Sequence, residues 1–235
     1  MSGEGLISAA DRIEIELERL ILEGEYQSGS RINENALAAR FDVSRGVVRE
    51  ACRLLQRSGL VNIVPNQGSF VCALSVAEIV NLFDVRACLG RLAGRLAAAT
   101  VTRSALQEMR ELIDKMDEAS RASDADRYIG LNIAFHATLY GTTGNAQLAT
   151  LDAQMGKQLR IYRRHGLEFG GGLTVSNVEH RSILAAIERG DCEAAGNEVE
   201  KHIENGRDRF IRAMSATGQL VLKENVTGPL GRRRA

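Results

Sequence analysis

The sequence predicts a mostly α-helical protein in two parts: a small N-terminal unit that ends in a β-hairpin, and a longer antiparallel bundle of helices. Three observations predict this fold class. The 235 residues include only two prolines, which would break helix interiors. Long stretches rich in Ala, Leu, Arg and Glu favour helix. Near residue 65, the short β-rich runs "LVNIV" and "SFVCA" flank the turn "PNQG", which predicts a hairpin.

Composition excludes several classes of protein. Hydrophobic residues make up 44% and charged residues 26% of the chain, which is ordinary for a globular protein. The formal net charge is zero, so bulk charge gives no sign of a nucleic-acid partner. No leader or membrane-spanning run is visible. The cysteines lack metal or disulfide spacing, which indicates free thiols in a reducing cytoplasm. They are Cys52, Cys72, Cys88 and Cys192.

The N-terminal unit begins with three predicted helices. The first, in "SAADRIEIELERLILEGEY", has a buried stripe and stops near Gly24. "QSGSRI" is predicted as a turn. Asn33 is the expected N-cap of a short second helix, and Ser44 caps the third, which ends at Gly59. Two helices separated by so few residues form a helix-turn-helix.

The third helix carries an arginine every four residues, which places these side chains along one side. They are Arg45, Arg49, Arg53 and Arg57. Apolar residues repeat on the opposite side: Val47, Val48, Ala51, Leu54 and Leu55. A solvated helix is one interpretation. However, the hairpin follows at once, and this order is that of a winged helix, in which the third helix would meet a DNA duplex.

The segment "SGSRINENALAARFDVSRGVVREACRLLQRSGLVNIVPNQGSFV" resembles the DNA-binding domain of GntR-family bacterial transcription regulators. A Gly-x-Arg turn, a Leu-Ala pair, the run from Val43 to Ala51 and a glycine at the wing tip carry the resemblance. The chain departs from the family at Gly46 and Val47, where the family has Thr-Pro. With the arginine face, the resemblance implies operator contacts from Arg31, Asn35, Ser44, Arg45, Arg49, Gln67 and Gly68.

The rest of the chain is predicted as an antiparallel bundle of six or seven helices. Ser75 and Glu78 form a capping-box pattern at the start of a helix that runs to about Thr100. Ser176 and Glu179 repeat that pattern. Further helices are expected over 103–119, 124–140, 145–165, 177–189 and 192–215. The expected domains are therefore a winged helix over 1–74 and a bundle over 75–217, with a disordered tail over 218–235.

The bundle resembles the FCD domain, the all-helical effector domain of the FadR subfamily of GntR regulators. The matching stretches are "LFDVRACLGRLAGRLAA", "NIAFHATLYGTTGN" and "EHRSILAAIERGDCEAAGNEVEKHI". The resemblance implies that the domain dimerises and binds a small organic acid.

Three of the four histidines lie on apolar faces of three separate predicted helices: His136, His180 and His202. A single such histidine is usually a core residue, but three favour a shared site. Asn132 lies one turn before His136 and can converge with it. The FCD resemblance implies a divalent metal ion, zinc or nickel-like, held by these histidines, with Asn132 where the family has Asp. An uncharged amide predicts weaker binding. The alternative is a polar, water-filled pocket lined by the same residues.

Arg86 falls on an otherwise apolar stripe of the long helix, and a charge that faces a core needs a partner. Either a glutamate of another helix forms a salt bridge with it, or it anchors an anion, because a guanidinium binds a carboxylate bidentately. The resemblance favours the anchor. The expected effector set is Arg86, Asn132, His136, Arg160, Tyr162, His180 and His202.

Together these features predict a ligand-responsive transcription regulator, a repressor released by a small carboxylic acid, rather than an enzyme. It is expected to be a homodimer, because one recognition helix reads few base pairs. One alternative is a metal-dependent enzyme with an accessory winged helix. No general base stands beside the histidines, however, and the arginine face would be unexplained. A second alternative is an architectural DNA binder with no ligand.

Overall fold

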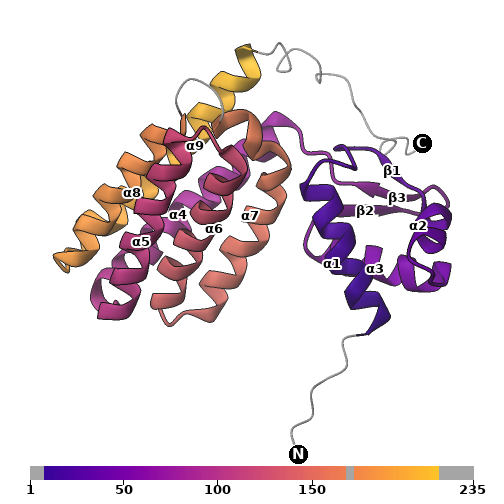
Figure 1. The fold of residues 1–235 in the computed structure, drawn as a ribbon, viewed down its shortest axis with the longest axis horizontal. Coiled ribbons are helices and arrows are strands. Elements are labelled where there is room, and N and C mark those ends of the chain that lie inside the picture. The colour runs from indigo at the N-terminus through magenta and orange to yellow at the C-terminus, as the bar shows by residue number, and fades with distance from the viewer. Residues whose placement is uncertain (1–7, 168–171, 217–235) are drawn as a thin grey trace, which may run out of the picture. The chain divides into compact units, whose positions relative to one another are not determined.

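The computed structural model describes residues 8–167 and 172–216. The expected disordered tail over 218–235 lies outside them. The chain divides into two compact units, Met1–Leu74 with Thr150–Tyr162, and Ser75–Ala149 with Arg163–Ala235. The described part is mostly helical with one small antiparallel sheet (Figure 1), so the predicted fold class is confirmed. No described helix is both long and apolar enough to cross a bilayer.

The first unit is a winged helix. It contains α1 (Ala9–Leu22), β1 (Arg31–Ile32), α2 (Glu34–Arg40), α3 (Arg45–Arg57), β2 (Val61–Val64) and β3 (Gly68–Val71). The sheet is antiparallel in the order β1-β3-β2. Arg31 pairs with Phe70, so the prediction of "QSGSRI" as a turn alone was wrong. A strand of two residues is too short to show the alternation that identifies strands in a sequence.

The ends of α2 and α3 are fixed by the predicted caps. The side chain of Asn33 accepts a hydrogen bond from the backbone of Ala36 at 3.1 Å, and Ser44 does so from Val47 at 3.4 Å. Gly59, at φ +74°, follows the end of α3. The buried face of α3 packs into the core of the unit, so the arginines face outward. That face consists of Val48, Ala51, Cys52 and Leu55.

The middle of α7 (Ala146–Leu167) belongs to the first unit rather than to the bundle. The Tyr162 hydroxyl accepts a hydrogen bond from the backbone of Leu74 at 2.7 Å and lies 2.9 Å from the Ser28 hydroxyl. Lys157 pairs with Glu18 at 2.8 Å. The sequence predicted residues 75–217 as one unit, whereas the structure groups the middle of α7 with the first unit. Helical periodicity shows that a helix has a buried face, but it does not show which core covers that face.

The second unit is a bundle of long helices. They are α4 (Val76–Thr100), α5 (Arg103–Arg121), α6 (Ala125–Thr142), α8 (Gly172–Glu188) and α9 (Cys192–Ala216), together with the ends of α7. The predicted capping box is present at the start of α4, where Ser75 and Glu78 bond each other's backbone. Large apolar side chains fill the centre of the unit, among them Met109, Ile113, Phe135 and Ile183.

The start of α8 differs from the prediction. The helix begins at Gly172, so Ser176 and Glu179 lie inside it and form no capping box. Ser176 is buried, and the Glu179 carboxylate binds side chains of α9. The pattern was misread because the Ser-x-x-Glu spacing also places both side chains near one face of a continuing helix.

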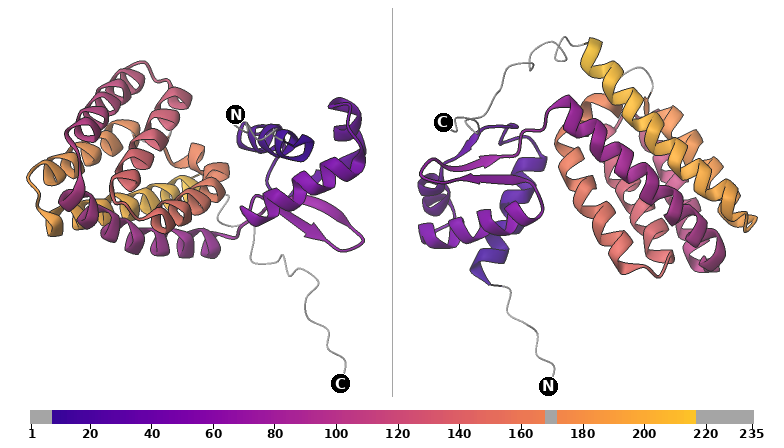
Figure 2. Two further views of the ribbon diagram at one scale, coloured as in Figure 1. Left: turned by 90° about the horizontal axis from the view of Figure 1, so that it is seen from below. Right: turned by 180° about the vertical axis from the view of Figure 1, so that it is seen from behind.

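Helices α4 and α9 lie side by side (Figure 2) because glycines remove side chains from their contact. A Cβ atom on Gly94 would lie 2.4 Å from the backbone oxygen of Ala195. One on Gly90 would lie 2.4 Å from the Ile203 side chain. The first contact involves backbone, which cannot move aside cheaply.

We therefore predict opposite effects for two glycine substitutions. Gly94→Ala should lower the free energy of unfolding by about 1–3 kcal/mol, because the methyl group overpacks the interface of α4 with α9. Gly130→Ala, on an exposed position of α6 with nothing within 4 Å of the new methyl group, should raise it by about 0.5–1 kcal/mol through helix propensity. Urea unfolding followed by circular dichroism measures both. Equal shifts in the same direction would contradict the packing described here.

Candidate functional site

The first unit carries a groove between α3, the start of α2 and the wing formed by β2 and β3. Six of the seven residues predicted to contact DNA line it: Arg31, Asn35, Arg45, Arg49, Gln67 and Gly68. Ser44 instead caps α3. Arg53 also lines the groove, so three of the four arginines on α3 face the same space as the wing.

The arginines of the groove are exposed and available to a ligand. The side chains of Arg45 and Arg49 are 63% and 60% exposed. Between them and the wing lies Glu34, only 13% exposed, whose Oε2 is 3.8 Å from Nη2 of Arg45 and 4.0 Å from Nε of Arg49. Arg53 pairs instead with Glu50 at 2.9 Å. The groove therefore presents positive charge around one fixed carboxylate.

The wing tip requires glycine at position 68. Gly68 has φ +108°, in the region that favours glycine. A Cβ atom there would lie 3.4 Å from Nε and Nη2 of Arg31. The guanidinium of Arg31 therefore lies against Gly68, on the side where a Cβ atom would project.

In the second unit the three predicted histidines meet. His136 on α6, His180 on α8 and His202 on α9 are all buried, and one nitrogen of each lies within 4.8 Å of the others. The Nε2 atoms of His136 and His202 are 3.2 Å apart. The ring centroids of His180 and His202 are separated by 4.5 Å. The structure thus brings together side chains that lie up to 66 residues apart in the chain.

The orientation of His202 is set by Glu179. Nδ1 of His202 lies 2.7 Å from Oε2 of Glu179, and a carboxylate accepts, so this nitrogen donates. Arg209 binds both oxygens of the same carboxylate at 2.7 and 3.0 Å, and Asn205 donates to it at 2.8 Å. Burial alone would raise the pKa of Glu179, but hydrogen bonds from His202 and Arg209 lower it to about 2. A carboxylate therefore faces His202 at neutral pH.

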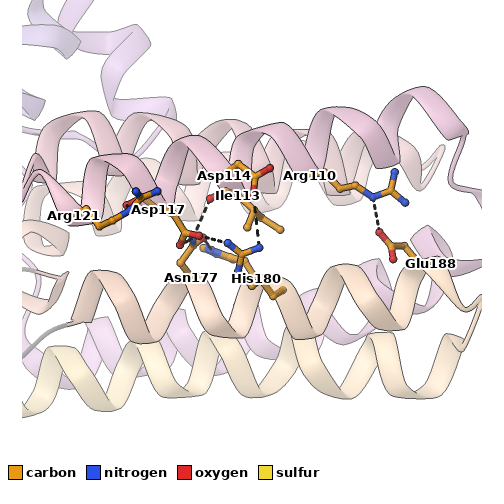
Figure 3. Close-up of polar contacts among 9 residues, drawn as sticks. Arg110, Ile113, Asp114, Asp117, Arg121, Asn177, His180 and Glu188 are labelled. Carbon is orange, nitrogen blue, oxygen red and sulfur yellow. Dashed lines mark hydrogen bonds and ion pairs between the residues drawn. The ribbon is translucent and has the colours of Figure 1, made fainter.

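His180 has a second support of the same kind, on α5. Its Nδ1 lies 3.4 Å from the side-chain oxygen of Asn177. The amide nitrogen of Asn177 donates to the backbone oxygen of Ile113 at 3.0 Å and to the carboxylate of Asp117. Figure 3 shows this chain of contacts crossing from α8 to α5. Both histidines thus use Nδ1 for contacts within the protein, as the histidines of metal sites commonly do.

The remaining predicted residues divide between the two units. Asn132 is 4% exposed and makes no side-chain hydrogen bond to another described residue, and Arg86 is 3% exposed. Arg86 lies on the face of α4 that packs on α9, because its neighbours on that stripe, Phe83 and Gly90, contact α9. Arg160 and Tyr162 belong to the first unit. The Tyr162 hydroxyl accepts a hydrogen bond there from the backbone of Leu74.

Sequence reasoning missed three residues that support the histidine site: Asn177, Glu179 and Arg209. Asn177 lies three residues before His180 on the same helix, so a search for polar residues one turn from each histidine finds Asn177. Glu179 was assigned to a cap. Tyr128 is fully buried, and burial raises the pKa of its hydroxyl to about 12. No sequence signal points to Tyr128, because its burial depends on packing between helices.

A winged helix with an arginine-lined groove, followed by a helical domain with a buried polar site, is the arrangement of a DNA-binding transcription regulator. The chain belongs to the GntR family. Residues 9–71 match the family described as bacterial regulatory proteins, gntR family, and residues 81–205 match the FCD domain. The predicted family membership is confirmed.

Relatives agree with this class. The chain is 28% identical over 220 residues to an HTH-type transcriptional regulator in an unstable DNA locus of Streptomyces ambofaciens, covering 94% of this chain and 92% of that relative. It is 26% identical to the HTH-type transcriptional repressor RspR of Escherichia coli, covering 80% and 82%. The fold resembles E. coli McbR/YncC with TM-score 0.75 at 21% identity, covering 88% and 99%. The Streptomyces ambofaciens relative and RspR are described as transcriptional regulators, so they do not support the metalloenzyme alternative.

The role of Glu179 gives a stability prediction. Glu179→Gln should lower the free energy of unfolding by about 3–5 kcal/mol, because Arg209 would remain buried without its counter-charge. The matched control is Glu188→Gln on the same helix. Its carboxylate pairs with Arg110 at 2.9 Å, but both side chains are substantially exposed (Figure 3), and the loss should stay below about 1 kcal/mol. Chemical unfolding measures both; equal losses would show that the Glu179 network is not the stronger one.

Proposed function

We propose that this regulator is a repressor that binds operator DNA through the arginine-lined groove and is released by a small carboxylic acid bound in the helical domain. The observation that carries the DNA part is the convergence of α2, α3 and the wing on one groove. The observation that carries the sensory part is the meeting of three buried histidines from three helices. The E. coli relative named above is a repressor. A protein that binds chromosomal DNA is expected to act in the cytoplasm.

Within the groove, we assign base contacts to the exposed arginines of α3. A guanidinium can donate two hydrogen bonds to the edge of a guanine in the major groove. Arg31, Gln67 and Gly68 at the wing, with Asn35 and Ser44 near the two helix starts, are suited to positioning contacts with the phosphate backbone, since small and polar groups there can approach closely. All seven residues that the sequence predicts as operator contacts are thus proposed to bind DNA.

Arg49→Ala should weaken binding to a specific operator by about 1–3 kcal/mol, with relaxed preference at one base pair, because a bidentate base contact is lost. Arg110→Ala, in the helical domain and outside the groove, is the control and should leave operator affinity unchanged. Fluorescence anisotropy at physiological salt, with operator and base-substituted duplexes, measures the effect. Unchanged affinity for Arg49→Ala would remove this residue from the DNA interface.

The histidine site fits a divalent metal ion. Two nitrogen ligands bonded to one zinc ion at about 2.1 Å lie roughly 3.0–3.4 Å apart, and the Nε2 atoms of His136 and His202 are 3.2 Å apart. The Nδ1 atoms of His180 and His202 are already bound by Asn177 and Glu179, as is usual for metal-bound histidines. Asn132 offers an amide oxygen in place of a charged ligand. The metal would hold the three helices together and present a positive charge to an acid.

Metal binding should raise the midpoint of thermal unfolding. Zinc or nickel at about 100 times its dissociation constant stabilises a native-state site by about 2.7 kcal/mol. His180→Ala should abolish the shift, and Asn132→Asp should tighten binding, because a carboxylate adds negative charge. Calorimetry and elemental analysis of untagged protein prepared without chelator test this. If neither the wild type nor Asn132→Asp binds metal, the polar, water-filled pocket replaces the metal site.

For the acid, we propose Arg86 as the anchor. Its side chain is buried on the face of α4 that packs against α9, the helix that carries His202. A guanidinium there could bind one carboxylate while a metal ion or the histidines bind another group of the same ligand. The ligand changes operator affinity only if it prefers one arrangement of the protein over the other.

Arg86→Ala should reduce the affinity for the acid while the ligand-free protein still binds DNA. A thermal-shift screen of small mono-, di- and tricarboxylates on the wild type identifies the ligand, and calorimetry then compares the variant. Operator binding without ligand serves as the internal control. Retained ligand affinity would make Arg86 a structural salt bridge. Joint loss of ligand binding, DNA binding and helicity would make it a residue needed for folding.

We further propose a homodimer. Val85 and Leu92 on α4 are 52% and 43% exposed, with Cys88 exposed between them. These three side chains are spaced by three and four residues and share one face of the helix. A second copy is the expected cover, because two recognition helices are needed to read both halves of an operator.

A further inference from the structure

We propose that Glu34 is a specificity-determining residue of the DNA-binding groove: it weakens binding to every duplex and holds Arg45 and Arg49 in position for the operator. This inference rests on the proposed DNA contacts. The starting observation is that the groove is lined by four arginines and a single acidic residue. A carboxylate is unexpected in a groove that binds DNA phosphates, because its negative charge repels the duplex.

Glu34 is held rigidly. It is the first residue of α2, and its Oε1 accepts a hydrogen bond from the Ser69 hydroxyl at 3.0 Å. Ser69 lies on β3 and is 1% exposed. The carboxylate is therefore tied to the wing on one side and to α2 on the other. An acidic residue in the first turn also stabilises the helix dipole, but any exposed position of that turn would serve this purpose. Burial against the wing would not be needed.

The second oxygen of Glu34 faces the recognition helix. Oε2 lies 3.8 Å from Nη2 of Arg45 and 4.0 Å from Nε of Arg49. These separations are too long for hydrogen bonds. The carboxylate therefore attracts both guanidinium groups without occupying their donors, and both side chains stay about 60% exposed. The two arginines, one turn apart on α3, are drawn toward the wing side of the groove and keep their hydrogen bonds for base edges.

Two consequences follow. On a duplex without the operator sequence, the arginines could contact only phosphates, and the fixed negative charge of Glu34 would oppose that contact. On the operator, the pre-oriented guanidinium groups would meet guanine edges, and the arginines would lose less freedom on binding. Glu34 thus penalises the wrong partner more than the right one, which raises the ratio of the two affinities.

The test uses Glu34→Gln in the full-length protein. Glutamine keeps the shape and can still accept the hydrogen bond from Ser69, but it lacks the charge. The operator is the sequence that the wild type selects from a pool of random duplexes, and the competitor is a shuffled duplex of the same composition. We expect the affinity of the variant for the shuffled duplex to rise at least about tenfold and its affinity for the operator to rise by less than about threefold, so the ratio of operator to shuffled affinity should fall about threefold or more.

The matched control is Glu50→Gln. Glu50 lies on α3 beside Arg53, at 2.9 Å, but it does not line the groove. Its removal changes the net charge equally, so it should raise both affinities by similar factors and leave their ratio unchanged. The salt dependence gives a second readout. The slope of log affinity against log salt for the shuffled duplex should steepen by about 0.9 for each arginine that gains a phosphate in Glu34→Gln.

An unchanged ratio in Glu34→Gln, or a change no larger than that in Glu50→Gln, would overturn the proposal. If circular dichroism shows that Glu34→Gln is unfolded, Ser69→Ala takes its place. This variant keeps the charge but frees the carboxylate, and a fall in the ratio supports the proposal while an unchanged ratio overturns it. Failure of the wild type to select any sequence would count instead against the proposed operator binding, so the two failures are distinguishable.

Discussion

The carboxylate of Glu179 lies partly buried between Arg209 and His202, and the histidine site depends on this contact. An ionised carboxylate inside a helical bundle is stable only if its oxygens are bound, and here Arg209, Asn205 and His202 bind them. The same hydrogen bonds fix the imidazole of His202, whose Nε2 then points toward His136. The position of one nitrogen in a ligand site is thus set by an ion pair between α8 and α9. Any ligand that binds the histidines acts on the packing of these two helices.

In the winged helix, too, a carboxylate lies close to basic side chains, but there the basic side chains are exposed. Its arginines lie at the surface, where they are free to bind DNA, and the groove contains one carboxylate that is fixed by the wing. In both units an acidic side chain contacts the groups for which we propose ligand binding. In the helical domain it orients a histidine through a short hydrogen bond. In the groove it acts on arginines at 3.8 and 4.0 Å, through charge alone.

Much of this arrangement could be predicted from the sequence, and the reasons are specific. The arginines of α3 repeat every four residues, and the caps at Asn33, Ser44 and Ser75 use local spacing that a sequence displays directly. The three histidines stood out because each interrupts an apolar stripe. The features that the sequence did not predict depend on contacts between distant segments. The pairing of Arg31 with Phe70 and the assignment of the middle of α7 to the first unit have no local signature.

Glu179 is the clearest example of a contact that has no local signature in the sequence. Its spacing from Ser176 fits a cap, and only the packing of α8 on α9 reveals that it binds His202 and Arg209 instead. Tyr162 was expected near the effector because it lies on a helix of the bundle by sequence. Its hydroxyl in fact binds the backbone of Leu74 in the first unit.

The position of the His202 ring depends on the hydrogen bond that its Nδ1 donates to Glu179, and this bond places its Nε2 3.2 Å from Nε2 of His136. Long-range proton–nitrogen NMR of the metal-free protein at neutral pH measures this directly, with His202→Gln used to assign the signals. The account predicts a proton on Nδ1 of His202, with a signal that changes in Glu179→Gln. A ring protonated on Nε2 alone would contradict it, since Nδ1 could then not donate a hydrogen bond to the Glu179 carboxylate.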